Sequence, residues 1–295
     1  MARTPAYTLH DGFRMPKGFP VEGFVSGLTY RARPEDIFVS TYPKCGTTWM
    51  QHIVHLVLQR GEPLAADRRL TEAIPHLEEV GSRFVETLPE PRVIKTHLPF
   101  AMTPWHPQAR YVYVARNPFD CVVSFFHHTR GFPQHYDFAD GTFDDYFECF
   151  LAGEVDFGDY CENVGSWYAR RDDDNLLLLT YERMLADPRG ALVAVGEFLG
   201  PRGAAVREAG VLDAILHHSS FAAMSRDQDR WSSRRPQGMP PFVRKGIVGD
   251  WATHLSPAQA RRLAARLTSH GAGLEALWPE VLESVRSLPG AAERA

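Results

Sequence analysis

The sequence predicts an α/β protein with a central parallel sheet flanked by helices, for two reasons. Four short and continuously apolar segments, at residues 36–41, 93–96, 111–115 and 175–181, have the composition of strands that are covered on both faces. Segments with helical spacing lie between or after them, and this alternation is typical of a doubly wound sheet. With 295 residues the chain can bury one sizeable core, so we expect a single domain over 1–295.

The expected helices follow the strands in order. A glycine-containing turn leads from the first strand into a largely apolar helix at 47–60, and further helices are expected at 119–128, 143–152 and 190–199. A last helix at 256–268 has Ser256 as its N-cap and Pro257 at its first position. Residues 225–250 lack periodicity and contain several prolines and serines, so we expect a long loop that is either functional or disordered.

Composition excludes several classes of protein. The formal net charge of −4 argues against general nucleic-acid binding, which usually needs a basic face. Residues 1–24 show no secretory leader, and no apolar run is long enough to cross a bilayer. The four cysteines have no metal-ligand spacing and give no reason to propose disulfides, which favours a reducing cytoplasm.

Lysines are rare among the basic residues, which are mostly arginine. The chain has four: Lys17, Lys44, Lys95 and Lys245. Lysine is a compact point charge whereas arginine is a wide planar fork, so a retained lysine can mark a place where the fork does not fit. The last three of these lysines lie in the motifs described next.

The sequence Tyr-Pro-Lys-Cys-Gly-Thr-Thr-Trp at 42–49 is the strongest functional signal. It places a turn between a strand and a helix N-terminus, where backbone N–H groups and the helix dipole favour an anion. Lys44 adds a full charge, and Thr47 and Thr48 add hydroxyl donors. The site suits a phosphate, yet it is no Walker A loop, because the lysine precedes a single glycine instead of following a second one.

Four motifs together resemble the cytosolic sulfotransferase family. Residues 42–49 resemble its 5′-phosphosulfate loop, Lys-Thr-His-Leu-Pro at 95–99 its catalytic strand and loop, and Arg-Asn-Pro-Phe-Asp at 116–120 its 3′-phosphate site. Arg-Lys-Gly at 244–246 with Gly-Asp-Trp at 249–251 resembles its C-terminal cofactor loop. The resemblance covers about residues 20–280. It implies a single α/β domain with a P-loop-like phosphosulfate-binding turn.

The resemblance implies transfer of a sulfuryl group from 3′-phosphoadenosine 5′-phosphosulfate (PAPS) to a hydroxyl of a small phenol or alcohol, without a metal. His97 would be the general base, because histidine titrates near neutral pH. Lys44 would stabilise the leaving phosphate, and Lys95 the charge on the transferring group. Such an in-line displacement asks the protein mainly for positioning and fixed charge.

The resemblance also implies a set of cofactor contacts. The 5′-phosphosulfate would meet the turn residues Lys44, Cys45, Gly46, Thr47 and Thr48. The 3′-phosphate would meet Arg116, Ser124 and Arg244, with Lys245 and the backbone near Gly246 completing the site. Trp49 and Phe221 would enclose the adenine, with Ser219 and Tyr181 close to it.

The sequence departs from the family pattern in three ways. Cys45 stands where the family more often has serine, and its place beside Lys44 at a helix start predicts a reactive thiol with a lowered pKa; a buried, inert thiol is the alternative. The family's dimer signature has no match in 252–262, so oligomeric state stays open. His76 and His128 align with acceptor-pocket positions that are often apolar, which fits either a more polar acceptor or two solvated histidines.

Two other functions compete with this interpretation. A nucleotide or small-molecule kinase would need a Walker A lysine and a carboxylate for Mg²⁺, and neither occurs in the right context. A module that only binds adenosine bisphosphates would keep Arg116 and Ser124 but would have no use for His97 and Lys95. The sequence therefore favours the sulfotransferase, with no nucleic-acid or membrane partner expected.

Overall fold

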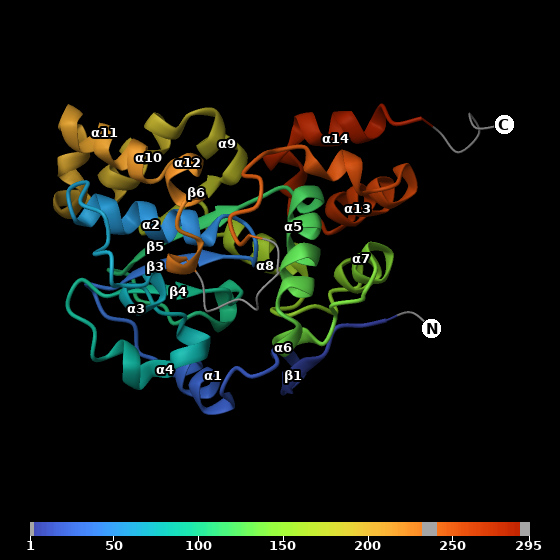
Figure 1. Cartoon of the computed structure of the whole chain (residues 1–295), viewed down its shortest axis with the longest axis horizontal. Helices are drawn as coiled ribbons and strands as arrows, with labels where there is room; N and C mark the ends of the chain where they lie inside the picture. The colour runs from blue at the N-terminus through green and yellow to red at the C-terminus, as the bar shows by residue number, and fades with distance from the viewer. Residues whose placement is uncertain (1–2, 232–240, 290–295) are drawn as a thin grey trace.

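The computed structural model describes residues 3–231 and 241–289. Figure 1 shows the chain from its N-terminus to its C-terminus. The strands are β1 (Tyr7–His10), β2 (Phe13–Pro16), β3 (Ile37–Thr41), β4 (Val93–Thr96), β5 (Arg110–Ala115) and β6 (Leu176–Thr180). The α-helices are α1 (Val21–Leu28), α2 (Thr47–Leu58), α3 (Leu70–Ala73), α4 (Leu77–Val85), α5 (Pro118–Gly131), α6 (Pro133–Tyr136), α7 (Phe143–Leu151), α8 (Tyr160–Tyr168), α9 (Tyr181–Ala186), α10 (Pro188–Phe198), α11 (Ala209–His218), α12 (Phe221–Met224), α13 (Pro257–Ser269) and α14 (Pro279–Arg286). Short 3-10 helices are η1 (Phe100–Met102), η2 (Gly200–Arg207), η3 (Gln228–Arg230), η4 (Asp250–Thr253) and η5 (Leu274–Leu277).

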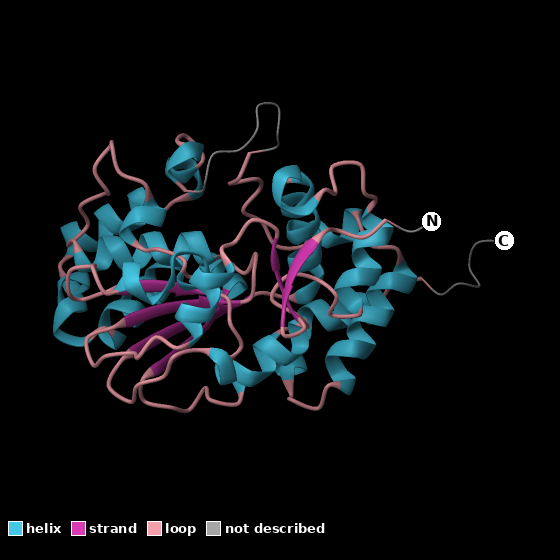
Figure 2. Cartoon of the chain, turned by 90° about the horizontal axis from the view of Figure 1, so that it is seen from below, coloured by secondary structure: helices cyan, strands magenta, loops and turns pink. Residues whose placement is uncertain are grey.

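A four-stranded parallel sheet with the order β4-β3-β5-β6 forms the centre of the molecule. These are the four apolar segments that the sequence predicts as strands, and the predicted parallel α/β fold is confirmed. Figure 2 shows this sheet apart from the small antiparallel ribbon of β1 and β2, which the sequence analysis did not predict. The ribbon's side chains are mostly half-buried and lack the continuous apolar run of the central strands.

Alternate residues of the central strands face two hydrophobic cores. Val39 and Val112 pack with α2, α10 and α11 on one face of the sheet. Phe38, Tyr111 and Tyr113 pack with α5, α8, α13 and α14 on the other. Successive side chains of a strand point to opposite faces, so continuous apolar segments are what a sheet covered on both sides requires.

The strand order places a crevice at the end of β3. From β3 the chain goes to β4 on one side and then crosses to β5 on the other. In parallel α/β sheets, ligands bind at this reversal, outside the carboxyl ends of the strands. The motifs at 42–49, 95–99 and 116–120 follow β3, β4 and β5 at those ends, so the topology brings three distant segments together.

The predicted helices are found with small shifts at their ends. The N-terminal cap of α13 is confirmed, because the Ser256 hydroxyl accepts a hydrogen bond from the N–H of Gln259 and the Gln259 side chain accepts one from the N–H of Ser256. The expected loop at 225–250 contains η3 and the start of η4. Its serines and prolines at 232–240 lie outside the described residues.

Candidate active site

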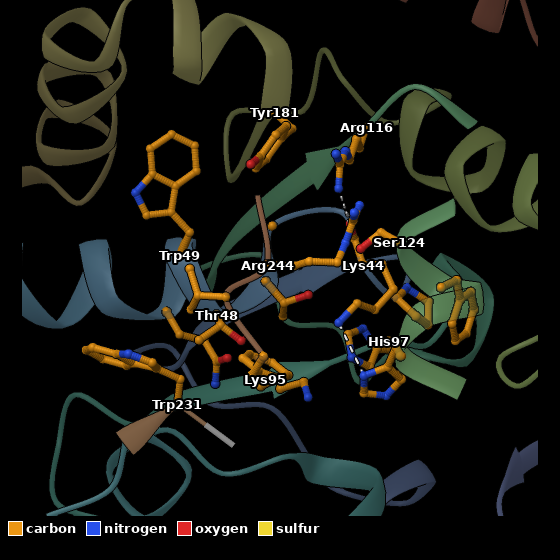
Figure 3. Close-up of a pocket in the computed structure, with 18 of the residues that line it drawn as sticks. Lys44, Thr48, Trp49, Lys95, His97, Arg116, Ser124, Tyr181, Trp231 and Arg244 are labelled. Atoms are coloured by element: carbon orange, nitrogen blue, oxygen red, sulfur yellow. Dashed lines mark hydrogen bonds between the residues drawn. The ribbon is translucent and has the colours of Figure 1, made fainter. Parts of the chain in front are cut away.

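A cavity of about 420 Å³ opens at the carboxyl edge of the sheet. Figure 3 shows Lys44, Lys95 and His97 beside Arg116, Ser124 and Arg244 around it. The other predicted residues that line it are Gly46, Thr47, Thr48, Trp49, His76, His128, Tyr181, Ser219, Phe221, Lys245 and Gly246. Cys45 is the predicted residue that is missing from the lining. The structure therefore brings together residues that are spread over two hundred positions of the chain.

The turn between β3 and α2 is shaped to present backbone donors. Lys44 has φ 68° and Gly46 has φ 96°, both in the left-handed region. A Cβ at Gly46 would lie 2.8 Å from Cδ2 of Tyr181, so only glycine fits there. Helix α2 has no side-chain cap, which leaves the N–H groups of its first turn for a ligand. These features fit an anion such as a phosphate or sulfate.

His97 is fixed in one tautomer by Thr41. Its Nδ1 lies 2.9 Å from the Thr41 carbonyl oxygen and 3.2 Å from the Thr41 hydroxyl. A carbonyl oxygen only accepts hydrogen bonds, so Nδ1 carries the proton and donates it. Neutral His97 then has Nε2 as its unprotonated nitrogen. The Thr41 hydroxyl also lies 2.7 Å from that of Thr47, which links His97 to the turn between β3 and α2.

Burial and neighbouring charges keep His97 neutral. Burial, followed by the positive charge of Lys95 and by His76, lowers the pKa of His97 well below its ordinary value. Burial also lowers the pKa of Lys95. The negative charges of Glu79 and Glu78 partly offset this lowering. An imidazole that stays unprotonated at neutral pH can accept a proton during a reaction.

Glu78 holds the backbone beside His97, and the sequence analysis did not identify it. Its Oε1 accepts hydrogen bonds from the His97 N–H at 2.6 Å and from the Thr96 hydroxyl at 2.9 Å. Its Oε2 lies 3.3 Å from Nε2 of His76. Although burial alone would raise the pKa of Glu78, His76 and the His97 N–H lower it. Glu78 is thus a buried carboxylate that positions the segment carrying His97.

Arg116 also lines the cavity. Its guanidinium donates to the carbonyl oxygens of Lys44 at 3.4 Å and Ile247 at 3.1 Å, and it lies 4.5 Å from the ring centre of Tyr181. The side chain is 7 % exposed, and its Nε has no hydrogen-bond partner among the described residues. A buried guanidinium with an unused donor suits an anionic ligand.

The loop at 244–251 is held by two aspartates, which lie in the motifs at 116–120 and 249–251 but were given no role of their own. Asp120 of α5 accepts hydrogen bonds from the N–H groups of Gly249 at 2.8 Å and Trp251 at 3.0 Å. Asp250 accepts from Arg244 at 2.6 Å and from Lys245 at 2.5 Å. Burial alone would raise the pKa of Asp250, but these two cations lower it. The loop is therefore fastened to α5 while its cations are paired beside the cavity.

Aromatic side chains form the wall between the turn and the loop. The Trp49 and Tyr181 rings meet edge to face at 5.5 Å. Phe221 is 44 % exposed, and a Cβ at Gly246 would lie 2.4 Å from its ring, so the glycine allows the loop to pack on it. Trp231, which the sequence analysis did not identify, also lines the cavity (Figure 3). Flat apolar walls of this kind suit the faces of a heterocyclic base.

Comparison with known proteins places this arrangement in a family. Residues 34–273 match the sulfotransferase domain. The chain is 33% identical over 282 residues to sulfotransferase 1C2 of Rattus norvegicus, covering 89% of this chain and 93% of that protein. It is 36% identical over 267 residues to sulfotransferase 2B1 of Mus musculus, covering 86% and 77%. The chain belongs to the sulfotransferase family.

Solved structures agree with this assignment. The mouse sulfotransferase SULT7A1, solved in complex with PAP, shares 25% identity and a TM-score of 0.74, covering 93% of this chain and 99% of that chain. A retinol dehydratase solved with retinol and PAP has the same fold, with 24% identity, a TM-score of 0.70 and coverage of 82% and 83%. The present chain is a PAPS-dependent sulfotransferase, as its four motifs predict.

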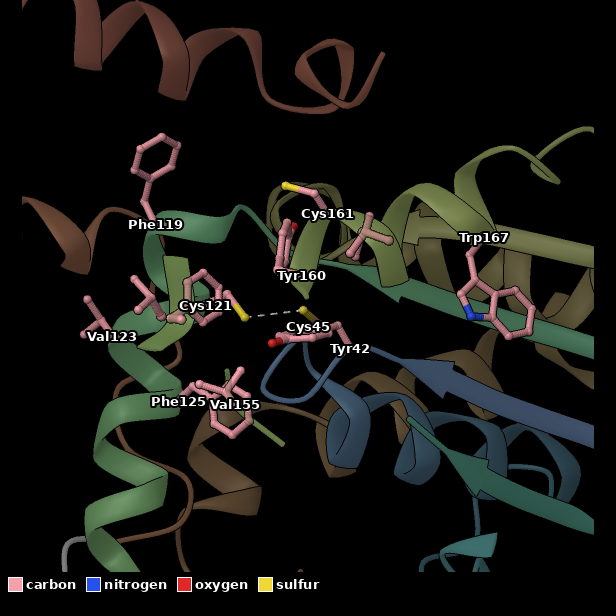
Figure 4. Packing of buried hydrophobic residues seen from close by; sticks show 14 of the residues in the cluster. Tyr42, Cys45, Phe119, Cys121, Val123, Phe125, Val155, Tyr160, Cys161 and Trp167 are labelled. Carbon is pink, nitrogen blue, oxygen red and sulfur yellow. Dashed lines mark hydrogen bonds between the residues drawn. The ribbon is translucent and has the colours of Figure 1, made fainter. Parts of the chain in front are cut away.

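For Cys45 of this sulfotransferase, the predicted lowered pKa is wrong, and the alternative of a buried thiol is the one that fits. Figure 4 shows its thiol among buried aromatic side chains, and the Sγ lies 3.8 Å from that of Cys121. Burial and then the hydrogen bond with Cys121 raise the pKa of Cys45 well above its ordinary value. The thiol points into the core, so desolvation outweighs the positive charge of Arg116, which works in the lowering direction. Cys45 does not offer its side chain to the cavity.

His76 and His128 both line the cavity of the sulfotransferase. The His76 ring meets the His97 ring edge-on at 4.9 Å, and Nδ1 of His128 lies 3.3 Å from Nζ of Lys44. His76 is 5 % exposed, so it is not a solvated histidine. The buried carboxyl of Asp156 also lines the cavity, and the sequence analysis did not identify it.

Among residues 3–231 and 241–289, no group of three or more His, Cys, Asp or Glu side chains is placed to hold a metal ion. In the same part of the chain, none of the helices combines the length and the apolar character needed to cross a bilayer.

Proposed function

We propose that this sulfotransferase transfers the sulfuryl group of PAPS to the hydroxyl of a small phenol or alcohol by in-line displacement, with His97 as the general base. The observation that carries the proposal is the hydrogen bond from Nδ1 of His97 to the Thr41 carbonyl. It leaves Nε2 as the proton acceptor, in the same cavity as the phosphate-binding turn.

In this reaction one bond to sulfur forms while another breaks. The acceptor oxygen forms a bond to sulfur while its proton goes to Nε2 of His97. The bond between sulfur and the bridging phosphate oxygen breaks, and the electron pair leaves with adenosine 3′,5′-bisphosphate (PAP). Lys44 stabilises the charge that develops on the leaving phosphate, and Lys95 that on the transferring sulfuryl oxygens. Positioned charges of this kind act strongly in a cavity that excludes most water.

Unused hydrogen-bond donors support the proposed PAPS site. The first-turn N–H groups of α2 suit the 5′-phosphosulfate, and the buried guanidinium of Arg116 suits the 3′-phosphate. Ser124 lines the same cavity, and so does Arg244, which is paired with Asp250. A phosphate there would compete with the Asp250 carboxylate for Arg244, because both are anionic acceptors. Trp49 and Phe221 would hold the adenine between them.

The test is transfer of label from [³⁵S]PAPS to a panel of phenols, alcohols and amines, with a chelator present throughout. We expect labelled sulfate esters from hydroxyl acceptors and no loss of rate on chelation. Product analysis distinguishes an O-sulfate from an N-sulfamate. Exclusive labelling of amine nitrogen, or turnover that requires added divalent metal, would contradict the proposal.

A further inference from the structure

Asp156 carries a buried carboxyl that lines the cavity, and the mechanism above does not use it. The residue is 2 % exposed. The neighbouring Phe157 adopts φ 64° and donates its N–H to the carbonyl of Arg14 at 2.9 Å. The Phe157 ring lies 5.0 Å from that of His97. The segment that carries Asp156 is therefore fixed against the proposed base.

The carboxyl of Asp156 is only half satisfied. Its Oδ2 accepts a hydrogen bond from the Tyr136 hydroxyl at 2.8 Å. Its Oδ1 is buried and has no hydrogen-bond partner among the described residues. Burial raises the pKa of Asp156 to about 7, although the Tyr136 hydroxyl, the backbone N–H of Asp156 and the positive charge of Lys44 work in the opposite direction. A buried carboxyl oxygen without a donor is costly, so its presence in a ligand cavity needs a reason.

The charges around the cavity suggest what that reason is. Its described lining includes five cationic side chains, Lys44, Lys95, Arg116, Arg244 and Lys245, which suit the anionic donor. Only Glu79 and Asp156 among the described lining residues are acidic. The aromatic rings of Phe132, Tyr136 and Phe157 also line the cavity. A carboxyl among aromatic rings is suited to an ammonium group, which finds both a counter-ion and ring faces.

We propose that Asp156 is a specificity-determining residue that binds an ammonium group of the acceptor, so that the preferred acceptors are small hydroxylated amines. This inference rests on the proposed function, because the hydroxyl of such an acceptor is the group that His97 activates. The amine would donate to Oδ1 while Tyr136 keeps its hydrogen bond to Oδ2. The apolar walls would hold the carbon frame between the two ends.

A matched pair of probes tests the subsite. Tyramine and 4-propylphenol have the same phenol and nearly the same length, and differ in an ammonium for a methyl group. Binding of each probe to the protein saturated with PAP is measured by calorimetry, which needs no turnover. We expect tyramine to bind about tenfold or more tightly, because a hydrogen bond to a charged group is at stake. Equal or weaker binding of tyramine to the wild-type protein overturns the inference.

Two variants test whether Asp156 is the source of the preference for tyramine. Asp156→Asn should abolish the preference for tyramine and leave the affinity for 4-propylphenol within about threefold. Asp159→Asn is the matched control, because its carboxylate pairs with Arg266 at 2.8 Å and does not line the cavity. A preference that survives in Asp156→Asn contradicts the assignment. If tyramine binds as expected but neither phenol is sulfated, the subsite stands and the proposed hydroxyl transfer fails.

Discussion

At the scale of single residues, the site depends on which neighbour each titratable group meets. Thr41 fixes the tautomer of His97, and Lys95 and His76 help burial to lower its pKa. The same desolvation acts in the opposite direction on Cys45, whose thiol it keeps protonated. Position in the sequence places both residues near the turn, but only the side-chain direction decides which one can react.

The lowered pKa of His97 predicts the acid limb of the rate profile. A base is active when unprotonated, so a pKa below the ordinary 6.5 moves the loss of activity to lower pH. The value of kcat/KM for a neutral phenol should stay flat from pH 8 down to pH 6.5 and fall only below it. Measuring the profile in Asp156→Asn keeps the titration of Asp156, whose carboxyl faces Lys44, from contributing. An acid limb centred above pH 6.5 would contradict the assigned environment of His97.

The buried thiol of Cys45 predicts slow alkylation. With iodoacetamide and peptide mapping, Cys45 in the native protein should react no faster than Cys121, Cys149 and Cys161, all of which are buried. Bound PAP should not change its rate, because the thiol does not line the cavity. Rapid labelling of Cys45 that PAP prevents would mean that the thiol reaches the cavity.

At the scale of elements, the central strands and their following turns could be predicted because their signal is local. The apolar run at 93–96 and the Arg-Asn-Pro break at 116–118 mark strand ends without knowledge of the fold. Glu78, Asp120 and Asp156 could not be predicted, because each acts through partners that are distant in sequence. The hairpin of β1 and β2 was missed because its half-buried strands lack a strong apolar pattern.

The link between α5 and the C-terminal loop predicts a remote effect on nucleotide binding. Asp120→Ala removes the acceptor of two loop N–H groups, so the loop should lose its fixed position beside the cavity. The affinity for PAP, measured by calorimetry, should fall by about tenfold or more. The matched control is Asp213→Ala, which removes an exposed ion pair with Arg189. An affinity of Asp120→Ala within twofold of wild type would show that the link does not matter for binding.

At the scale of the whole molecule, the buried carboxyl of Asp156 makes the stability of the fold depend on pH. The folded-state pKa of Asp156, about 7, lies above the ordinary 3.8, so the folded protein holds an extra proton between about pH 4 and pH 7. The stability contributed by the neutral carboxyl is complete below that window and is lost as pH rises through it. Functional sites commonly retain groups that would be replaced if stability alone mattered.

This linkage can be measured by urea unfolding. Asp156→Asn cannot ionise, so its free energy of unfolding should exceed that of wild type by an amount that grows from pH 4 to pH 8. Tyr136, Tyr7 and Lys44 face the same carboxyl and are present in both proteins, so their titrations largely cancel in the difference. A difference that is independent of pH would mean that Asp156 is ionised throughout.

The most direct test of the account is the His97→Ala variant, assayed for both turnover and PAP affinity, with the exposed His217→Ala as control. The base acts on the acceptor proton, so kcat for transfer from PAPS should fall by about 100- to 10,000-fold. The affinity for PAP should stay within a few-fold of wild type, and His217→Ala should match wild type in both. Turnover by His97→Ala within a few-fold of wild type would remove His97 from the mechanism.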